Sequence, residues 1–341
     1  MSGKRLGIAE ALREGIAEEM RRDQRVFCIG EDIGIPGGWG GAFTVTLGLE
    51  KEFADRLINT PISEAGLVGA ALGAAMMGMR PIADVQYADF LFCAMDQVAN
   101  QVAKMRYMSG GKLETPMVLR APVGVTGRGA QHAQMMEPYF IPLPGIKIVC
   151  PATAYDAKGL LKAAVRDGNP VLMFEHKLLY GSKGPRSETG ALDASSDIPE
   201  EDYTVPIGKG IIRREGSDVT IVASLLMMHR AMEAAKLLAQ EGISAEVIDP
   251  RTLVPFDWDL VKGSVAKTGR VITVEESPRR GGVGGEIAAT LAEEMIDYLI
   301  APVKRVAAPN TPAPFAPPME KFYVPDAAKI AKAARDLMAI S

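Results

Sequence analysis

Short apolar runs alternate with amphipathic segments along the first half of this 341-residue chain. The runs are short enough to be buried strands, and the segments between them repeat their apolar residues at helical spacing. Alternation of this kind predicts a parallel sheet covered by helices. The expected strands are 26–29, 80–86, 117–120, 147–150 and 171–175, and the expected helices are 5–22, 64–79, 89–108 and 154–167.

The alternation stops in a polar stretch at 181–201 that is rich in Gly, Ser, Pro and Asp, and then resumes. We therefore predict an α/β protein of two domains, 1–185 and a smaller 206–341, joined by a linker at 186–205. A Pro-rich extended segment and a terminal helix end the chain. The second domain is expected to have strands 219–224, 245–248 and 271–275, and helices 229–240, 258–267, 284–299 and 326–338.

Composition narrows the class of protein. Hydrophobic residues make up 48% and the formal charge is -4, which favours neither a nucleic-acid nor a membrane-surface partner. The start of the chain carries no apolar signal core, so we expect a cytoplasmic protein. Three dispersed cysteines in apolar surroundings, Cys28, Cys93 and Cys150, are expected to be reduced core thiols.

One carboxylate, Glu64, heads the longest run of small apolar residues, 65–79. If that run is buried, desolvation favours the protonated acid, which suits proton sharing. The alternative is an ordinary acid at a helix N-terminus, stabilised by the helix dipole. Gly66, Gly69 and Gly73 leave one face of this helix nearly free of side chains, which indicates close packing inside the chain or across a subunit contact.

A polar, glycine-containing segment carries His132 between an expected strand and two aromatic residues. A loop histidine in this setting can move protons near neutral pH, although an ordinary surface histidine is the simpler alternative. The glycines at 281–285 follow a strand and imitate a dinucleotide fingerprint, but no glycine stands three residues after Gly284. A tight strand-to-helix turn is the better interpretation.

Several motifs together resemble the beta subunit of the thiamine-diphosphate-dependent 2-oxo acid dehydrogenase decarboxylase component, and the resemblance runs nearly end to end. It implies a transketolase-like pyrimidine-binding domain followed by a domain like the transketolase C-terminal domain. The motifs lie at 30–32, 60–66, 86–90, 107–111, 131–134, 156–160, 274–286 and 311–320.

The resemblance assigns roles to individual residues. Glu64 matches the glutamate that contacts the cofactor pyrimidine and shares a proton there, and His132 matches a histidine that assists acyl transfer to a lipoyl group. Ile62, Gln86 and Phe90 match positions that line the pyrimidine pocket. Some members also hold a potassium ion, largely through backbone carbonyls, at positions matching Met117, Ala164, Val165, Asp167 and Asn169.

The chain lacks the Gly-Asp-Gly motif with which thiamine-diphosphate enzymes bind the diphosphate and its magnesium. If the resemblance holds, that half of the site belongs to an alpha subunit, in a heterotetramer of two alpha and two beta subunits. The resemblance also implies a dihydrolipoyl acyltransferase core as a partner.

The motifs that bear on the choice of substrate disagree with one another. Residues 107–111 are more similar to pyruvate- and acetoin-type relatives, and 82–89 to branched-chain ones. Pyruvate is the first expectation, with acetoin and branched-chain 2-oxo acids as alternatives. Two rival functions stay open at this stage: a nicotinamide-dependent dehydrogenase, and a non-catalytic assembly subunit that docks an acyltransferase core.

Overall fold

A computed structural model describes residues 4–181 and 192–340. The chain divides into two compact units, one formed by 1–123 and 139–207 and the other by 124–138 and 208–341. The predicted bounds 1–185 and 206–341 stay a prediction, and residues 186–191 of the predicted linker lie outside the described residues. Three residues of the predicted linker pair in a sheet, because β8 (Ser196–Ile198) runs antiparallel to β1 (Lys4–Leu6).

The first unit is built on a parallel sheet, as the alternating pattern predicts. Its central strands are buried along almost their whole length, which explains why they appear in the sequence as continuous apolar runs. Across the sheet the order is β6 (Lys147–Val149), β7 (Val171–His176), β5 (Val118–Val123), β4 (Arg80–Asp84), β2 (Val26–Gly30) and β3 (Leu57–Asn59).

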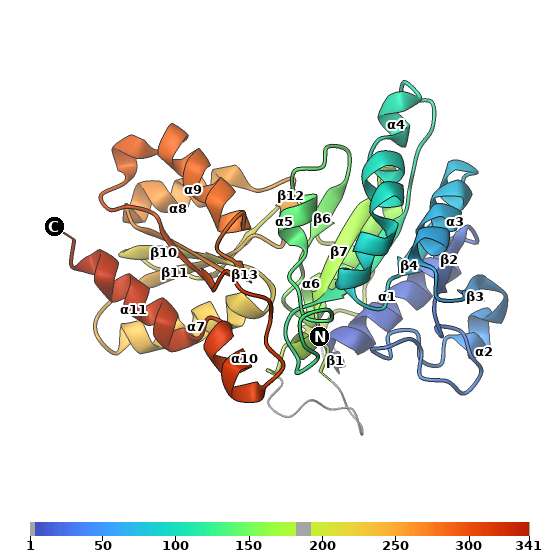
Figure 1. Ribbon diagram of the computed structural model, residues 1–341, viewed down its shortest axis with the longest axis horizontal. Coiled ribbons are helices and arrows are strands. Elements are labelled where there is room, and N and C mark those ends of the chain that lie inside the picture. The colour runs from blue at the N-terminus through green and yellow to red at the C-terminus, as the bar shows by residue number, and fades with distance from the viewer. Residues whose placement is uncertain (1–3, 182–191, 341) are drawn as a thin grey trace. The chain divides into compact units, whose positions relative to one another are not determined.

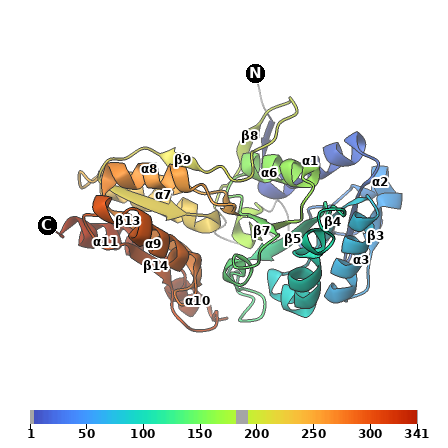
Figure 2. The same ribbon diagram turned by 90° about the horizontal axis from the view of Figure 1, so that it is seen from above.

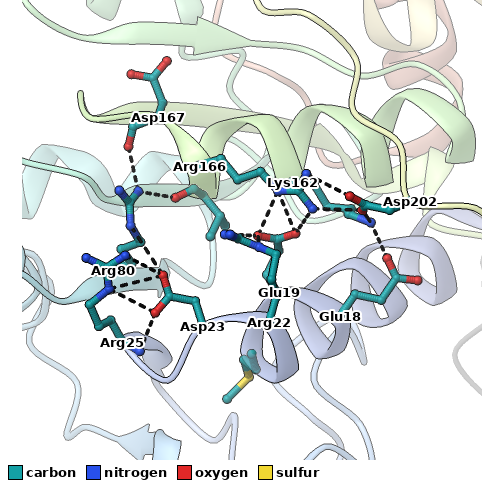
Figure 3. A network of polar contacts seen from close by, with 12 residues as sticks. Glu18, Glu19, Arg22, Asp23, Arg25, Arg80, Lys162, Arg166, Asp167 and Asp202 are labelled. Carbon is teal, nitrogen blue, oxygen red and sulfur yellow. Dashed lines mark hydrogen bonds and ion pairs between the residues drawn. The ribbon is translucent and has the colours of Figure 1, made fainter.

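Helices cover both faces of this sheet (Figure 2). On one face α1 (Ile8–Arg22) packs against α6 (Ala154–Arg166), and on the other lies α3 (Glu64–Met76). Ion pairs join α1 to α6, including Arg166 to Glu19 at 2.6 Å (Figure 3). The predicted helix 89–108 is instead a series of short helical turns, η2 (Ala88–Ala94), η3 (Gln97–Val102) and α4 (Met105–Met108). Short turns α2 (Glu50–Phe53), η1 (Ala54–Arg56) and η4 (Lys177–Leu179) complete the unit.

The second unit has a mixed sheet, because one edge strand runs against the others. Helices again lie on both faces, α7 and α11 on one and α8 and α9 on the other (Figure 1). The strand order is β14 (Lys304–Ala308), β13 (Val271–Pro278), β10 (Val219–Ala223), β11 (Ala245–Asp249) and the antiparallel β9 (Ile211–Arg214). The helical elements of the second unit are α7 (Leu225–Ala239), α8 (Trp258–Thr268), α9 (Val283–Glu294), η5 (Ile296–Tyr298), α10 (Pro317–Tyr323) and α11 (Ala327–Met338). A short strand, β12 (Thr252–Val254), precedes α8. The boundary between the two ranges falls within the short helix α5 (Glu137–Phe140).

The glycines after β13 form a tight turn into α9. This agrees with their spacing in the sequence, which does not match a dinucleotide fingerprint. The Glu275 carboxylate accepts the Gly284 N–H at 3.3 Å, and a Cβ on Gly282 would overlap a carboxylate oxygen of Glu275. A side-chain acid therefore occupies this helix N-terminus, where a dinucleotide would place its phosphates. The expectation of three core thiols is wrong at one position, because Cys93 is exposed while Cys28 and Cys150 are buried.

Candidate active site

Glu64 is the first residue of α3, at the edge where the parallel strands β2 and β4 end. Ser63 caps the helix, accepting the Gly66 N–H at 3.4 Å, so the capping role belongs to the serine and Glu64 is left for other contacts. Gly30, which ends β2, allows a close approach there: a Cβ at this position would lie 2.9 Å from the Asp84 carbonyl oxygen. Ligands of open α/β sheets bind at this kind of edge.

Several carboxylates gather at the same edge. Burial, together with the charges of Glu64, Asp32 and Asp84, raises the pKa of Glu31. That influence places the Glu31 and Glu64 carboxyl groups within electrostatic range of each other. Glu31 therefore holds a proton more readily than an isolated exposed acid does.

A buried arginine forms hydrogen bonds with carboxylates at this edge. Arg120 on β5 donates to Asp84 at 2.6 Å and, through Nε, to Glu175 at 2.8 Å, and its side chain is only 2% exposed. Tyr180 donates its hydroxyl to the same glutamate at 2.5 Å. These hydrogen bonds fix Asp84 in place. The sequence reasoning missed Glu31 and Arg120. Glu31 follows a buried strand at the carboxyl edge of the sheet and could have been found from that position, whereas nothing local marks Arg120.

The residues matched to the pyrimidine pocket lie near this edge of the chain. The Gln86 side-chain amide donates to the backbone carbonyl of Glu31 at 2.9 Å, so Gln86 lies beside the backbone of that residue. Phe90 is half-buried and meets Tyr87 edge to face with ring centroids 5.6 Å apart. Ile62 stands two residues before Glu64 and is 83% exposed. That exposure is high for an isoleucine and suits a side chain that another molecule covers.

The small-residue wall behind Glu64 is buried on one side only. Leu67, Val68 and Ala71 are in the core, whereas Ala70, Gly73 and Met77 are exposed. A Cβ on Gly73 would meet no atom within 4 Å. Close packing inside the chain is therefore not found at Gly73 among the described residues, whereas at Gly69, which is half-buried, a Cβ would lie 3.8 Å from the Gln97 side chain.

His132 belongs to the second unit, since the segment 124–138 packs with residues 208–341, whereas Glu64 is in the first unit. It is half-buried in a turn in which its backbone N–H donates to the Gly129 carbonyl at 3.3 Å. Local sequence gives no sign that this loop is carried by the later domain.

The carbonyls matched to the potassium site already have donors. One Arg80 guanidinium nitrogen donates to the carbonyls of Val165 at 2.6 Å and Asp167 at 3.0 Å (Figure 3). The Met117 carbonyl accepts a backbone N–H at 2.9 Å, as the Ala164 carbonyl does at 3.2 Å. The Asn169 side chain accepts from Arg106 at 3.0 Å. A guanidinium cation thus stands at two of the expected carbonyls, and this arrangement does not fit a potassium ion. The potassium site stays a prediction from the resemblance, and we derive no step from it.

Among residues 4–181 and 192–340, no group of three or more His, Cys, Asp or Glu side chains could hold a metal ion. Within the same ranges no helix is both long and apolar enough to span a bilayer.

Comparison with known proteins identifies both halves of the chain. The family described as the transketolase pyrimidine binding domain matches residues 4–183, and the one described as the transketolase C-terminal domain matches 208–330. A solved structure titled "Split gene transketolase, inactive beta4 tetramer" is similar with a TM-score of 0.78 and 26% identity, over 98% of this chain and 99% of that one.

Relatives with assigned activities are similar over almost the whole chain. The acetoin:2,6-dichlorophenolindophenol oxidoreductase subunit beta of Cupriavidus necator is 48% identical over 98% of each chain. The 2-oxoisovalerate dehydrogenase subunit beta of Bacillus subtilis is 44% identical, covering 97% of this chain and 98% of the relative. The mitochondrial pyruvate dehydrogenase E1 component subunit beta-2 of Oryza sativa subsp. japonica is 41% identical, covering 98% and 86%. The chain therefore belongs to the family of beta subunits of thiamine-diphosphate-dependent 2-oxo acid and acetoin dehydrogenases, with the transketolase-like pair of domains that its sequence predicts.

Proposed function

We propose that this chain supplies the pyrimidine-binding half of an active site whose diphosphate-binding half lies on an alpha subunit. The absence of Gly-Asp-Gly supports this division, as does the name "subunit beta" that the relatives carry. The similar structure of beta chains alone is titled inactive. We extend that property to this chain: without its partner it turns nothing over.

The observation that carries the proposal is the position of Glu64, beside Glu31 and at the head of a helix whose small-residue face is exposed. The residues present fit a pyrimidine ring. A carboxyl group can share a proton with the N1′ nitrogen, and Ile62 and Phe90 offer apolar surface to the ring. The Thr60 hydroxyl oxygen nearby is buried and has no hydrogen-bond partner among the described residues.

Thiamine diphosphate, when bound, supplies the nucleophilic carbon that attacks the substrate carbonyl. In this proposal Glu64 holds or shares the proton at the pyrimidine N1′ nitrogen, and Asp84, fixed by Arg120, keeps the neighbouring field negative. His132 assists transfer of the acyl group to a lipoyl thiol. Magnesium and the diphosphate are left to the alpha subunit.

The exposed face of α3 is where this proposal places a subunit contact. Gly66, Ala70, Gly73 and Met77 recur every three or four residues, and all four are exposed. Small side chains let two helix backbones approach closely. A heterotetramer of two alpha and two beta subunits is the expected assembly, and a dihydrolipoyl acyltransferase core is the expected acyl acceptor.

For the substrate we revise the first expectation. Identity to the acetoin relative is 48%, to the 2-oxoisovalerate relative 44% and to the pyruvate relative 41%, so similarity favours acetoin and branched-chain 2-oxo acids over pyruvate. We propose acetoin, with a branched-chain 2-oxo acid as the second candidate. Reduction of 2,6-dichlorophenolindophenol by the reconstituted pair, with acetoin, 2-oxoisovalerate and pyruvate in parallel, decides the order by kcat/KM. A kcat/KM highest for pyruvate overturns it.

The catalytic assignment is tested by Glu64→Gln in the reconstituted enzyme. The amide keeps the shape of the side chain but cannot share the proton, so we expect turnover to fall at least ~100-fold while assembly survives. Glu50→Gln, an acid in the first turn of another helix, is the matched control and should leave turnover unchanged. If Glu64→Gln turns over at the wild-type rate, this chain is better described as an assembly subunit.

A further inference from the structure

Two carboxylates of the second unit grip the loop that carries His132. The Val125 N–H donates to Glu276 Oε1 at 2.8 Å, and the Gly127 N–H donates to Glu320 Oε1 at 2.7 Å. Glu276 is on β13 and 2% exposed, and Glu320 is on α10 and half-buried. The two acceptors come from elements about forty residues apart in sequence, yet they hold alternate residues of one loop.

Apolar contacts hold the same loop against the same unit. Val125 and Ala133 pack in a cluster with Ala308, Ala313 and Tyr323. A Cβ on Gly129 would lie 3.4 Å from the Phe315 ring, so the turn before His132 lies close to the segment that leads into α10. The loop is therefore anchored from its start to the residue after the histidine.

These hydrogen bonds act on the backbone that sets the place of His132. A loop N–H has no partner from regular secondary structure, and an ionised acceptor makes a shorter, stronger hydrogen bond than a neutral one. Gly127 and Gly129 both have positive φ, 69° and 76°, so the chain reverses sharply between the gripped residues and His132. A small change at Val125 or Gly127 is thus carried into the position of the histidine.

We propose that Glu276 and Glu320 are positioning residues for His132, holding its loop in the geometry needed for acyl transfer to the lipoyl group. This inference rests on the proposed role of His132. Neither glutamate takes part in the chemistry itself. Both act on the histidine through the backbone of residues 125–132.

The test uses Glu320, because its half-buried place on a surface helix tolerates substitution better than that of Glu276. In the reconstituted enzyme, Glu320→Ala should lower kcat/KM for acylation of a lipoyl domain about tenfold and leave dye-linked turnover within about twofold of wild type. Glu320→Gln keeps an acceptor oxygen and should recover most of the loss. Glu293→Ala, an exposed acid of the same unit, is the control and should change neither assay. Equal losses in both assays, or no loss in either, overturn the inference.

Two further variants separate this inference from the proposed function. His132→Ala should impair lipoyl acylation more than dye-linked turnover, and adding Glu320→Ala to it should cause no further loss, because the positioned group is gone. If His132→Ala lowers both assays equally, the proposed role of the histidine fails. If His132→Ala is selective but the two substitutions multiply, the glutamate acts elsewhere and the positioning inference alone fails. Thermal unfolding of each variant confirms that the losses come from folded protein.

Discussion

Two helices of the first unit, α3 and α6, each have 13 residues and each begin at a hydroxyl side chain that caps the helix. The usual rule, by which apolar side chains are buried and charged side chains are exposed, is reversed in these two helices. The charged helix α6 is covered: Lys158 and Lys162 are 2% and 1% exposed at their side chains. The apolar helix α3, with no charge after Glu64, leaves Ala70, Gly73 and Met77 exposed.

The difference follows from what each helix can pair with inside the chain. Lys158 donates to Glu14 at 2.9 Å and to Glu18 at 2.7 Å, and Lys162 also pairs with Glu18 (Figure 3). Both of these carboxylates belong to α1, so acids of α1 pair with the buried lysines of α6. The exposed stripe of α3 has no such counterpart among the described residues of its own chain. Folding therefore buries the charged helix α6, whereas we propose that the exposed face of α3 is buried only by contact with the alpha subunit.

The largest expected effect is that of a substitution at Gly73. We expect Gly73→Leu to weaken association with the alpha subunit roughly 100-fold, because overpacking a close helix contact costs about 3 kcal/mol. The isolated chain should lose no stability, since a Cβ there meets no atom within 4 Å and leucine favours a helix interior over glycine. Sedimentation with the alpha subunit measures the association.

Gly263→Leu provides the matched control, because this exposed glycine also lies within a helix, α8, and its Cβ also meets nothing within 4 Å. It should leave association unchanged. Equal effects of the two substitutions would show that the α3 face is not a contact surface.

At α6 the expected effect is on folding. Lys158→Met removes a buried charge that faces Glu14 and Glu18, and we expect a loss of about 1–3 kcal/mol in the free energy of unfolding. The lower end applies if the carboxylates, which are 27% and 32% exposed, regain water. Urea denaturation of the isolated chain measures it.

The control is Lys332→Met, whose pair with Asp336 is exposed by 71% and 43% and should contribute little to the free energy of unfolding. If the two lysine substitutions cost the same, the α1 and α6 interface is not held by its ion pairs.

A smaller substitution at Gly73 is expected to have two effects of opposite sign, one on the isolated chain and one on the assembled state. Gly73→Ala should stabilise the isolated chain by about 0.5–1 kcal/mol, since alanine favours a helix interior, and should weaken the assembled state. Gly263→Ala should give the same gain in the isolated chain without the loss in assembly. Unfolding midpoints with and without the alpha subunit separate the two contributions. A gain from Gly73→Ala in both states would count against an interface.

The smallest effect concerns the outer end of the α6 network. Hydrogen bonds from Arg166 and Lys162 hold the pKa of Asp202 well below its ordinary value. A lowered acid pKa stabilises the fold above the unfolded-state value, about 3.9, and that stabilisation is lost only as pH falls through the lowered pKa. Because the side chain is 60% exposed, Asp202→Asn should cost less than about 1 kcal/mol at pH 7.

That cost should persist to about pH 4 and disappear below it. Urea denaturation across this range measures the difference from wild type, with the exposed Asp197→Asn as the control. A cost that grew on acidification would contradict the linkage.

Much of the fold could be predicted from the sequence because its signals are local. Continuous apolar runs identify strands that are buried on both faces. The close packing indicated by the glycines at 66, 69 and 73 stays a prediction, because Gly66 and Gly73 are exposed. The predicted helix 89–108 failed, since apolar spacing alone does not distinguish one helix from consecutive turns of different hydrogen-bond type. The edge strands β3, β9 and β14 were missed because they are short and only partly buried.

A residue of the candidate site could be predicted only where its local sequence distinguishes it. Glu64 is distinguished as a single charge before an apolar run. The membership of the His132 loop depends on contacts with Glu276 and Glu320, which lie more than 140 residues away. The Arg80 contacts with the Val165 and Asp167 carbonyls span 85 and 87 residues, and they could not be predicted because backbone acceptors leave no trace in side-chain identity.

The exposed face of α3 has a consequence for how the protein must be produced. Ile62 and Met77, near the two ends of that helix, are 83% and 85% exposed, and a surface of this kind promotes non-specific association when it stays uncovered. A copy of the chain without a partner also forgoes the stabilisation that binding adds by mass action. If the alpha subunit covers this face, as we propose, co-expression of the two subunits should give more recoverable protein than expression of this chain alone.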